Sequence, residues 1–259
     1  MEMVYPWTTL FILAPLVFLG GFVDAVAGGG GLIALPAYLI AGFAPYHAIA
    51  TNKLSSSIGT AVSTGRFIKN KCVDWPTAIP SGILAVLGSA CGASLILTID
   101  EKIIRYMLLI ALPIVAFIVL RKRDIVEDSL VEIPRWRQFL FVMLASLIVG
   151  VYDGFYGPGA GTFLLLAYTQ LAKMPLRMAS GNVKISNLSS NLGSLTVFLI
   201  NGQAILPIGL VAAIFGIAGH YFGAGMLLKN GGKIVRPIII IVLGLLFVRV
   251  ILDLLGVGM

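Results

Sequence analysis

Charged residues are scarce in this sequence: Asp, Glu, Lys and Arg together make up 11% of 259 residues. A soluble domain carries about 25%. Hydrophobic residues make up 59%, and the mean hydropathy is +1.02. These values exclude an ordinary soluble domain and predict an all-α, polytopic membrane protein.

Cysteine and histidine are also scarce, with two of each. Cys72 and Cys91 indicate neither a disulfide framework nor a metal cage, and His47 and His220 have no partner at ligand spacing, so we interpret all four as structural. No nucleotide-binding loop or catalytic triad is recognisable. We therefore expect no cofactor, no metal and no enzymatic activity. The net charge of +7 does not indicate a nucleic-acid partner, since the basic residues lie mainly in short loops between apolar segments.

Glycine, in contrast, is concentrated at two places. Gly28–Gly31 interrupt the apolar stretch 10–40, and Asp24 lies one turn earlier. Asp153 precedes a second glycine-rich stretch, 157–161, about half a chain later. Glycine costs about 1 kcal/mol inside a helix, and irregular backbone at membrane depth survives only where it is buried in protein or lines a wet cavity. Two such breaks in matching positions indicate a transporter site.

The two halves of the chain share one register. Lys53 and Lys184 are separated by 131 residues. The same separation links Phe67 with Phe198, Pro76 with Pro207, Gly88 with Gly219, Gly92 with Gly223, Lys102 with Lys233 and Arg105 with Arg236. Upstream, the separation is one or two residues shorter. We predict two pseudo-symmetric repeats, 1–120 and 138–259, joined by a charged cytoplasmic linker, 121–137.

Each repeat divides into five apolar segments. We expect them at 8–27, 32–43, 47–66, 76–98 and 102–120, and at 138–156, 161–171, 178–200, 205–228 and 234–255. About 20 helical residues are needed to span the hydrocarbon core, so 32–43 and 161–171 are too short to cross upright alone. Each repeat is therefore predicted to contain a glycine-broken helical hairpin and about three long transmembrane helices. Small residues spaced as Gly88 and Gly92 predict helix–helix contacts.

The charge of the loops distinguishes two topologies. If the short segments carry the chain across, 13 Lys and Arg residues lie on one side and three on the other. If they do not, the division is nine against seven. The positive-inside rule favours the first arrangement, in which the two repeats are inverted. The sequence leaves open whether the short segments cross fully.

Two lysines inside apolar segments, Lys53 and Lys184, are candidate substrate-binding residues, because intramembrane charges mark functional sites. The polar residues around them are Thr51, Asn52, Ser55 and Ser56 in the first half and Asn187 and Asn191 in the second. The backbone N–H groups of Gly29, Gly30 and Gly159 add donors. Such a set suits a small oxyanion. The alternatives are lysines that reach headgroups or pair with an aspartate, and polar residues that only join helices.

Asp24 and Asp153 are candidate sites for a coupling proton or sodium ion, because each carboxylate precedes a glycine break by four residues. The alternative is that they cap a helix or pair with a lysine across the break.

Several of these motifs resemble those of the TauE/SafE family of sulfite exporters, over nearly the whole chain. In the first half they are Gly28 to Gly31 with Leu35-Pro36, then Ala50-Thr51-Asn52-Lys53-Leu54, and Val73-Asp74-Trp75. In the second half they are Gly157-x-Gly159-x-Gly161, Lys184-x-x-Asn187-x-x-x-Asn191 and Phe198-x-x-x-Gly202. The resemblance implies a multi-pass protein of a bacterial or archaeal cell membrane that transports sulfite, sulfonates or related organic anions.

We thus predict a secondary transporter of a small anion, with a midplane site between the two repeats. A passive channel for an anion or small solute, and a non-transporting membrane subunit, remain the alternatives. The expected partners are the anionic substrate, the lipid bilayer and a coupling proton or sodium ion. The sequence does not determine whether the protein forms a homo-oligomer.

Overall fold

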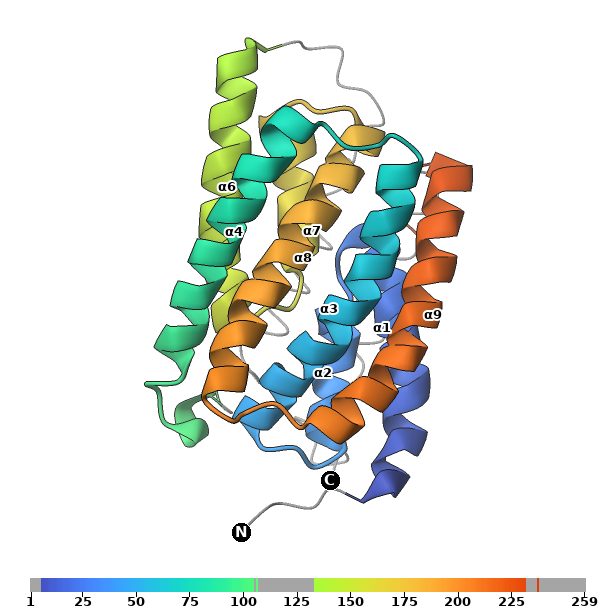
Figure 1. Cartoon of the computed structure of the whole chain (residues 1–259), viewed down its shortest axis with the longest axis vertical. Coiled ribbons are helices and arrows are strands. Elements are labelled where there is room, and N and C mark those ends of the chain that lie inside the picture. Colours follow the sequence, from blue (N-terminus) through green and yellow to red (C-terminus); the bar gives the residue numbers. More distant parts are fainter. Residues whose placement is uncertain (1–5, 105, 107–132, 232–236, 238–259) are drawn as a thin grey trace.

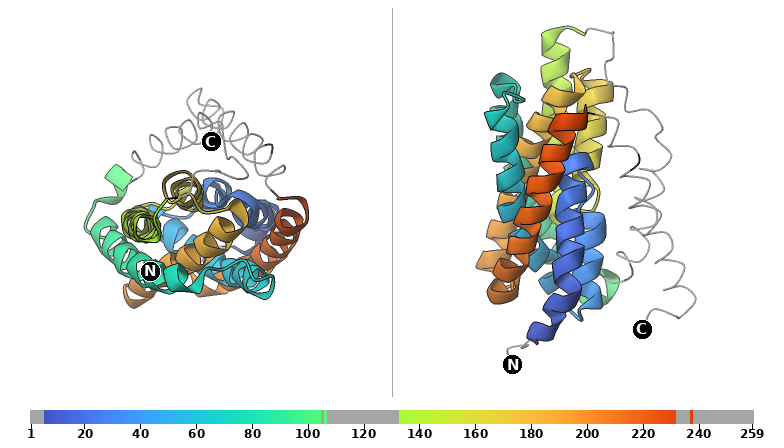
Figure 2. Two further views of the ribbon diagram at one scale, coloured as in Figure 1. Left: turned by 90° about the horizontal axis from the view of Figure 1, so that it is seen from above. Right: turned by 90° about the vertical axis from the view of Figure 1, so that its right-hand side faces the viewer.

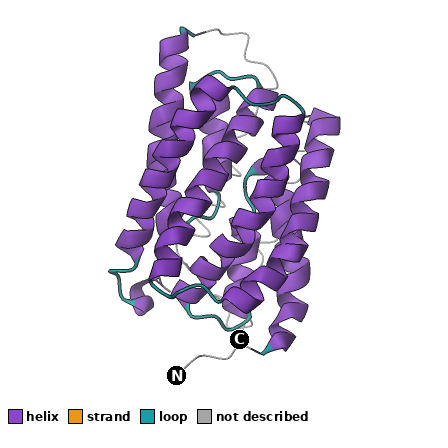
Figure 3. Cartoon of the chain, viewed as in Figure 1, coloured by secondary structure: helices purple, strands orange, loops and turns teal. Residues whose placement is uncertain are grey.

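A computed structural model of the chain describes residues 6–104, 106, 133–231 and 237. Every regular element in these ranges is a helix (Figure 3). Most of the predicted segments 102–120 and 234–255, and most of the predicted linker 121–137, lie outside the described residues. The all-helical class predicted from composition is therefore confirmed for the part of the chain that the structure describes.

The helices follow the predicted segments to within a few residues. The first half contains a 3-10 turn, η1 (Trp7–Thr9), and then α1 (Leu10–Ala27), α2 (Gly31–Ile40), α3 (Pro45–Lys69) and α4 (Trp75–Ile96). The second half contains α6 (Arg135–Phe155), α7 (Ala160–Leu166), a π-helical turn, η2 (Ala167–Leu171), α8 (Leu176–Ile200) and α9 (Leu206–Asn230). Because α6 begins at Arg135, the end of the predicted linker is helical.

Four helices are long and apolar enough to cross a membrane among the described residues. They are η1 with α1, α4, α6 and α9, with 21 to 25 residues each. The 25-residue helices α3 and α8 are also about 38 Å long, but they carry most of the buried polar side chains. The chain is a multi-pass membrane protein, and α3 and α8 hold its polar interior.

The helices of the two halves run in opposite directions along the long axis of the molecule (Figure 1). In that view α1 and α3 run upward and α4 downward, whereas α6 and α8 run downward and α9 upward. The contacts follow one pattern: α1 packs on α9 and α6 on α4, α3 packs on α9 and α8 on α4, and α3 contacts α8. The view along the long axis shows the same neighbours (Figure 2). Each half thus contributes helices to the packing of the other.

Glycine spacing explains the closest of these contacts. A Cβ atom on Gly92 of α4 would lie 2.1 Å from the carbonyl oxygen of Val151 on α6. A Cβ atom on Gly219 of α9 would lie 2.1 Å from the carbonyl oxygen of Phe18 on α1. Because only glycine allows the helix backbones to approach so closely, the predicted packing role of these glycines is confirmed.

Both predicted helix breaks are present and buried. Helix α1 ends at Ala27, and Gly28 then takes the left-handed conformation with φ +75°. Helix α6 ends at Phe155, and α7 follows Gly159, whose φ is +82°. Non-glycine residues rarely adopt such angles. The sequence therefore fixes the two places where the backbone turns inside the molecule.

The two breaks meet at their tips. The backbone N–H of Thr162 donates to the carbonyl oxygen of Gly28 at 3.2 Å, and its hydroxyl donates to the carbonyl oxygen of Ala27 at 2.8 Å. A Cβ atom on Gly28 would lie 2.2 Å from the carbonyl carbon of Gly161. No side chain fits between the two backbones at this point.

Replacing Gly28 by Ala should therefore destabilise the protein far more than replacing Gly42. Both residues have a left-handed φ, +75° and +85°, but a Cβ atom on Gly42 meets nothing within 4 Å. We expect Gly42→Ala to cost about 1–2 kcal/mol and Gly28→Ala about 1–3 kcal/mol more from overpacking. Thermal unfolding of both variants in detergent measures the difference, and equal midpoints would contradict the close contact.

Candidate functional site

Two buried ion pairs cross between the halves at the centre of the molecule. The Lys53 ammonium on α3 lies 2.7 Å from Oδ2 of Asp153 on α6. The Lys184 ammonium on α8 lies 3.0 Å from Oδ2 of Asp24 on α1. Each lysine therefore pairs with the aspartate of the other half. This arrangement is the pairing that the sequence left open as an alternative to free, anion-binding lysines.

The fold places both pairs at equivalent depths. Lys53 lies eight residues after the first residue of α3, and Lys184 lies eight residues after the first residue of α8. Asp24 and Asp153 lie in the last turn before the two breaks. An unpaired charge in such a place costs several kcal/mol, so pairing is the condition under which these residues can be buried.

Amide and hydroxyl groups complete the cluster. The Lys53 ammonium also donates to Oδ1 of Asn191 at 3.0 Å, and Ser190 donates to Oδ2 of Asp153 at 2.5 Å. The amide of Asn187 donates to Oδ2 of Asp24 at 3.2 Å, and Lys184 also donates to the backbone carbonyl of Asp24. Two ammonium groups and two carboxylates give the cluster a formal charge of zero.

A further matched contact joins α2 to α3 in the first half and η2 to α8 in the second. The Tyr38 hydroxyl donates to Ser55 at 2.9 Å, across 17 residues of sequence. The Tyr168 hydroxyl lies 2.8 Å from the hydroxyl of Ser186, across 18 residues. The additional residue lies in the π-helical turn η2. There the backbone N–H of Ala172 donates to the carbonyl oxygen of Ala167, five residues earlier.

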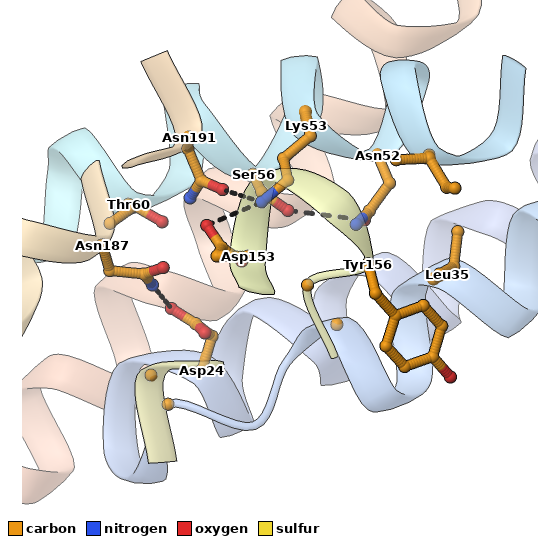
Figure 4. Close-up of a pocket in the computed structure, with 15 residues that line it drawn as sticks. Asp24, Leu35, Asn52, Lys53, Ser56, Thr60, Asp153, Tyr156, Asn187 and Asn191 are labelled. Carbon is orange, nitrogen blue, oxygen red and sulfur yellow. Dashed lines mark hydrogen bonds and ion pairs between the residues drawn. The ribbon is translucent and has the colours of Figure 1, made fainter. Parts of the chain in front are cut away.

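A polar cavity lies between the two breaks and helices α3 and α8 (Figure 4). Of the predicted site residues, its walls include Asp24, Asn52, Lys53, Ser56, Asp153, Asn187 and Asn191. The glycines on its walls are Gly28, Gly31, Gly157 and Gly161. Lys53 is thus the predicted lysine that reaches the cavity, together with both carboxylates.

The remaining predicted residues lie nearby but do not line this cavity. They are Thr51, Ser55, Lys184, Gly29, Gly30 and Gly159. The Thr51 hydroxyl accepts a hydrogen bond from the N–H of Ile205 at 3.0 Å, and Ser55 contacts Tyr38. Lys184 is turned to Asp24. Their predicted substrate contacts remain predictions.

Sequence reasoning missed Thr60 and Tyr156, which also line the cavity. The Thr60 hydroxyl oxygen is buried and has no hydrogen-bond partner among the described residues, and Figure 4 draws Thr60 among the side chains around the cavity. Two signals could have identified it: Thr60 follows Ser56 by one helical turn and precedes Asn191 by 131 residues. Tyr156, which follows Asp153, had no such signal.

The structure gives no sign of a metal centre in the part of the chain that it describes, where no three His, Cys, Asp or Glu residues are grouped to hold an ion. The two histidines differ in their surroundings. Nδ1 of His47 lies 2.7 Å from the carbonyl oxygen of Gln203 at the end of the molecule where α3 begins. Nδ1 of His220 lies 4.0 Å from Oδ2 of Asp24 inside the protein.

Comparison with known proteins gives one consistent result. A family model described as "Sulfite exporter TauE/SafE" matches residues 13–250. The probable membrane transporter protein YfcA of Escherichia coli K12 is 32% identical over 255 residues, covering 95% of this chain and 94% of that protein. A probable membrane transporter protein of Haemophilus influenzae is 34% identical over 244 residues, covering 94% and 95%. No solved structure matches the chain.

The crossed pairs lead to a prediction about stability. Lys53→Met leaves the Asp153 carboxylate buried and unpaired, so we expect a loss of about 3–5 kcal/mol of unfolding free energy. Adding Asp153→Asn removes the unpaired charge and should restore most of that loss. Unfolding in mixed detergent micelles measures both variants.

Arg135→Ala serves as the control for this measurement. Its guanidinium lies 2.9 Å from Asp74, but the arginine side chain is 65% exposed. An exposed pair contributes about 0–1 kcal/mol. If Lys53→Met costs no more than Arg135→Ala, the buried pair does not stabilise the fold as argued.

Proposed function

Because the chain belongs to the TauE/SafE family of sulfite exporters, we propose that it is a secondary transporter of a small anion, such as sulfite or a sulfonate. The protein is a multi-pass membrane transporter and not an enzyme. The observation that carries the anion proposal is the central cavity, where the Lys53 ammonium and a set of amide and hydroxyl groups meet the two helix breaks.

The donors around the cavity suit an oxyanion. Asn52, Asn187 and Asn191 provide side-chain N–H groups, and Ser56 and Thr60 provide hydroxyls. Helix α2 begins at the cavity wall with Gly31, and the N-terminus of a helix favours negative charge. A carboxylate, sulfonate or sulfite group needs several such hydrogen bonds when it leaves water, because an unpaired anion is costly to bury.

The neutral charge of the cluster supports coupling to a cation. Lys53 and Lys184 are already balanced by Asp153 and Asp24, so an anion entering alone would give the buried cluster a net negative charge. A proton or a sodium ion on one of the carboxylates removes that cost. Asp24 and Asp153 are accordingly the proposed coupling residues.

We further propose that the two halves form inverted repeats about a pseudo-two-fold axis in the membrane plane. The opposite directions of α1 and α6, and of α3 and α8, support this arrangement (Figure 1). So does the distribution of basic residues, because the α3–α4 loop, the start of α6, the η2–α8 loop and the end of α9 share one end of the molecule. This end carries Arg66, Lys69, Lys71, Arg135, Arg137, Lys173, Arg177 and Lys229. By the positive-inside rule it faces the cytoplasm.

Counterflow in proteoliposomes tests the transporter proposal. Vesicles loaded with unlabelled sulfite, a two-carbon sulfonate or a small carboxylate are diluted into the same labelled anion. A carrier concentrates label transiently above the outside level, whereas a channel only equilibrates it. A thermal-shift panel with the same anions identifies which one binds, because ligand binding raises stability by mass action. Equilibration without overshoot would favour a passive channel, and no flux with any anion would favour a non-transporting subunit.

The unpaired hydroxyl of Thr60 gives a prediction that separates binding from stability. Thr60→Val removes a buried hydroxyl that has no partner among the described residues, so the free energy of unfolding should stay the same or rise. If Thr60 donates to the anion, the variant loses a hydrogen bond of about 1.5–3 kcal/mol, and affinity falls about tenfold or more. Thermal shift against anion concentration measures both effects.

Thr64→Val is the matched control, one turn further along α3. Its hydroxyl donates to the carbonyl oxygen of Lys184 at 3.2 Å. This variant should lose about 1 kcal/mol of unfolding free energy. A Thr60 variant that behaves like the Thr64 variant, with lower stability and unchanged affinity, would show that the Thr60 hydroxyl does not contact the anion.

A further inference from the structure

The two aspartates of the central cluster have different second neighbours. Asp153 accepts a hydrogen bond from Ser190 at 2.5 Å. The residue 131 positions before Ser190 is Gly59, so α3 offers Asp24 no such hydroxyl. An imidazole faces Asp24 instead: Nδ1 of His220 lies 4.0 Å from its Oδ2. The residue 131 positions before His220 is Ser89, so the two halves differ in sequence at this position.

The fold makes room for this imidazole with glycines. A Cβ atom on Gly59 would lie 2.4 Å from Cδ2 of His220, and one on Gly21 would lie 2.9 Å from the same atom. His220 is 2% exposed, and its Nδ1 also lies 3.1 Å from the Ser63 hydroxyl. The side chain is thus held beside Asp24 by α1, α3 and α9 together.

Asp24 and His220 both line a second cavity. It extends between α1, α2, α3 and α9 past Val17 and Gly216. Asp24 and Ser56 border both this cavity and the central one, whereas Asp153 is found on the central one. The Asp24 side chain is 13% exposed and that of Asp153 is 6%. Asp24 therefore borders a second cavity whose lining includes neither Lys53 nor Asp153.

We propose that Asp24 binds the coupling proton of the transporter and that His220 relays it from the second cavity, while Asp153 remains paired with Lys53. This inference rests on the proposed function and narrows its two coupling candidates to one. The proton passes from water to the imidazole and then to Oδ2 of Asp24. One bridging water or a small rotation closes the 4.0 Å gap.

The charge balance of the step follows from the groups that face Asp24. These are Lys184 and Asn187 on α8 and His220 on α9, with the Lys53–Asp153 pair across the cavity. Protonation of Asp24 changes the cluster from neutral to a net charge of +1, which one monovalent anion returns to zero. Anion and proton then cross together, and anion affinity rises as the pH falls.

The surroundings of Asp24 favour a proton over a sodium ion. Its Oδ2 already accepts hydrogen bonds from the Lys184 ammonium and the Asn187 amide. A hard metal cation needs a shell of oxygen ligands, and an adjacent ammonium repels it. Imidazole, by contrast, is the side chain best suited to carry a proton near neutral pH.

Two transport measurements in the same proteoliposomes test the proposal with labelled sulfite and a labelled two-carbon sulfonate. Counterflow needs no net proton movement, whereas accumulation driven by an inward proton gradient does. The double variant Asp24→Asn/Lys184→Met removes one whole pair and leaves the cluster neutral. In this variant and in His220→Gln, the ratio of gradient-driven accumulation to counterflow should fall to the uncoupled level. The mirror variant Asp153→Asn/Lys53→Met is also neutral and should exchange more slowly but keep the wild-type ratio. Ser89→Ala, at the position paired with His220, is the control and should match the wild type.

A second readout does not depend on transport. In weakly buffered detergent solution, the wild-type protein should take up about one proton for each two-carbon sulfonate ion that it binds. A pH indicator records this uptake. Asp24→Asn/Lys184→Met should take up none, and Asp153→Asn/Lys53→Met should still take up about one proton per anion that it binds. If His220→Gln fails to fold, as judged by its thermal midpoint, the comparison of the two double variants decides.

The outcomes separate this inference from the proposed function. Anion exchange in the wild type without any response to the proton gradient would overturn the inference and leave the transporter proposal intact. Equal loss of coupling in both double variants, or full coupling in Asp24→Asn/Lys184→Met, would also overturn it. Absence of exchange for every anion tested would remove the transporter proposal itself, and the inference with it.

Discussion

The crossed pairing of Lys53 with Asp153 and of Lys184 with Asp24 is the interaction on which the centre of this molecule depends. Four charges are buried inside the protein, and each is tolerated because it is paired with an opposite charge. In both pairs the partner comes from the other half of the chain. This requirement holds the lysine side chains of α3 and α8 against the ends of α6 and α1. It also requires α1 and α6 to end where the partner lysines lie, so that the backbone beyond each aspartate can turn aside. The glycine contact between Gly28 and Gly161 follows, since the two turns must share the same small space.

Much of this organisation could be predicted from the sequence because it rests on local chemistry. Four adjacent glycines cannot continue a helix cheaply, and a lysine in an apolar segment needs a reason to be there, so the breaks and the buried lysines were both recognisable. The glycine contacts of α4 and α9 were predictable for the same reason. Which aspartate each lysine meets was not predictable, because the partners are about 100 to 160 residues apart and either pairing satisfies the charges. The proposed roles of Thr60 and His220 could not be predicted from the sequence, because each depends on what faces the residue from another helix.

A neutral cluster also changes how a transport cycle can work. Fixed, unpaired positive charges would hold an anion tightly and release it slowly, whereas balanced pairs attract an anion only while a second ion upsets the balance. In the proposed cycle, binding and release can both be fast, because the buried cluster is neutral before the anion arrives and neutral again while it is held. The free energy needed to bury these charges is supplied when the protein folds. It is not drawn from substrate binding in each transport cycle.

The π-helical turn η2 has a consequence for the history of the chain. It contains Tyr168 and precedes α8. The stretch from Tyr168 to the start of α8 is one residue longer than the stretch from Tyr38 to the start of α3. A single inserted residue inside a helix is accommodated as one wide turn of this kind, which leaves the flanking residues in their places. If the two halves descend from one duplicated gene, η2 marks an insertion that occurred in one copy after the copies had separated. Both tyrosines kept their serine partners through it, and the two copies have since been free to become different.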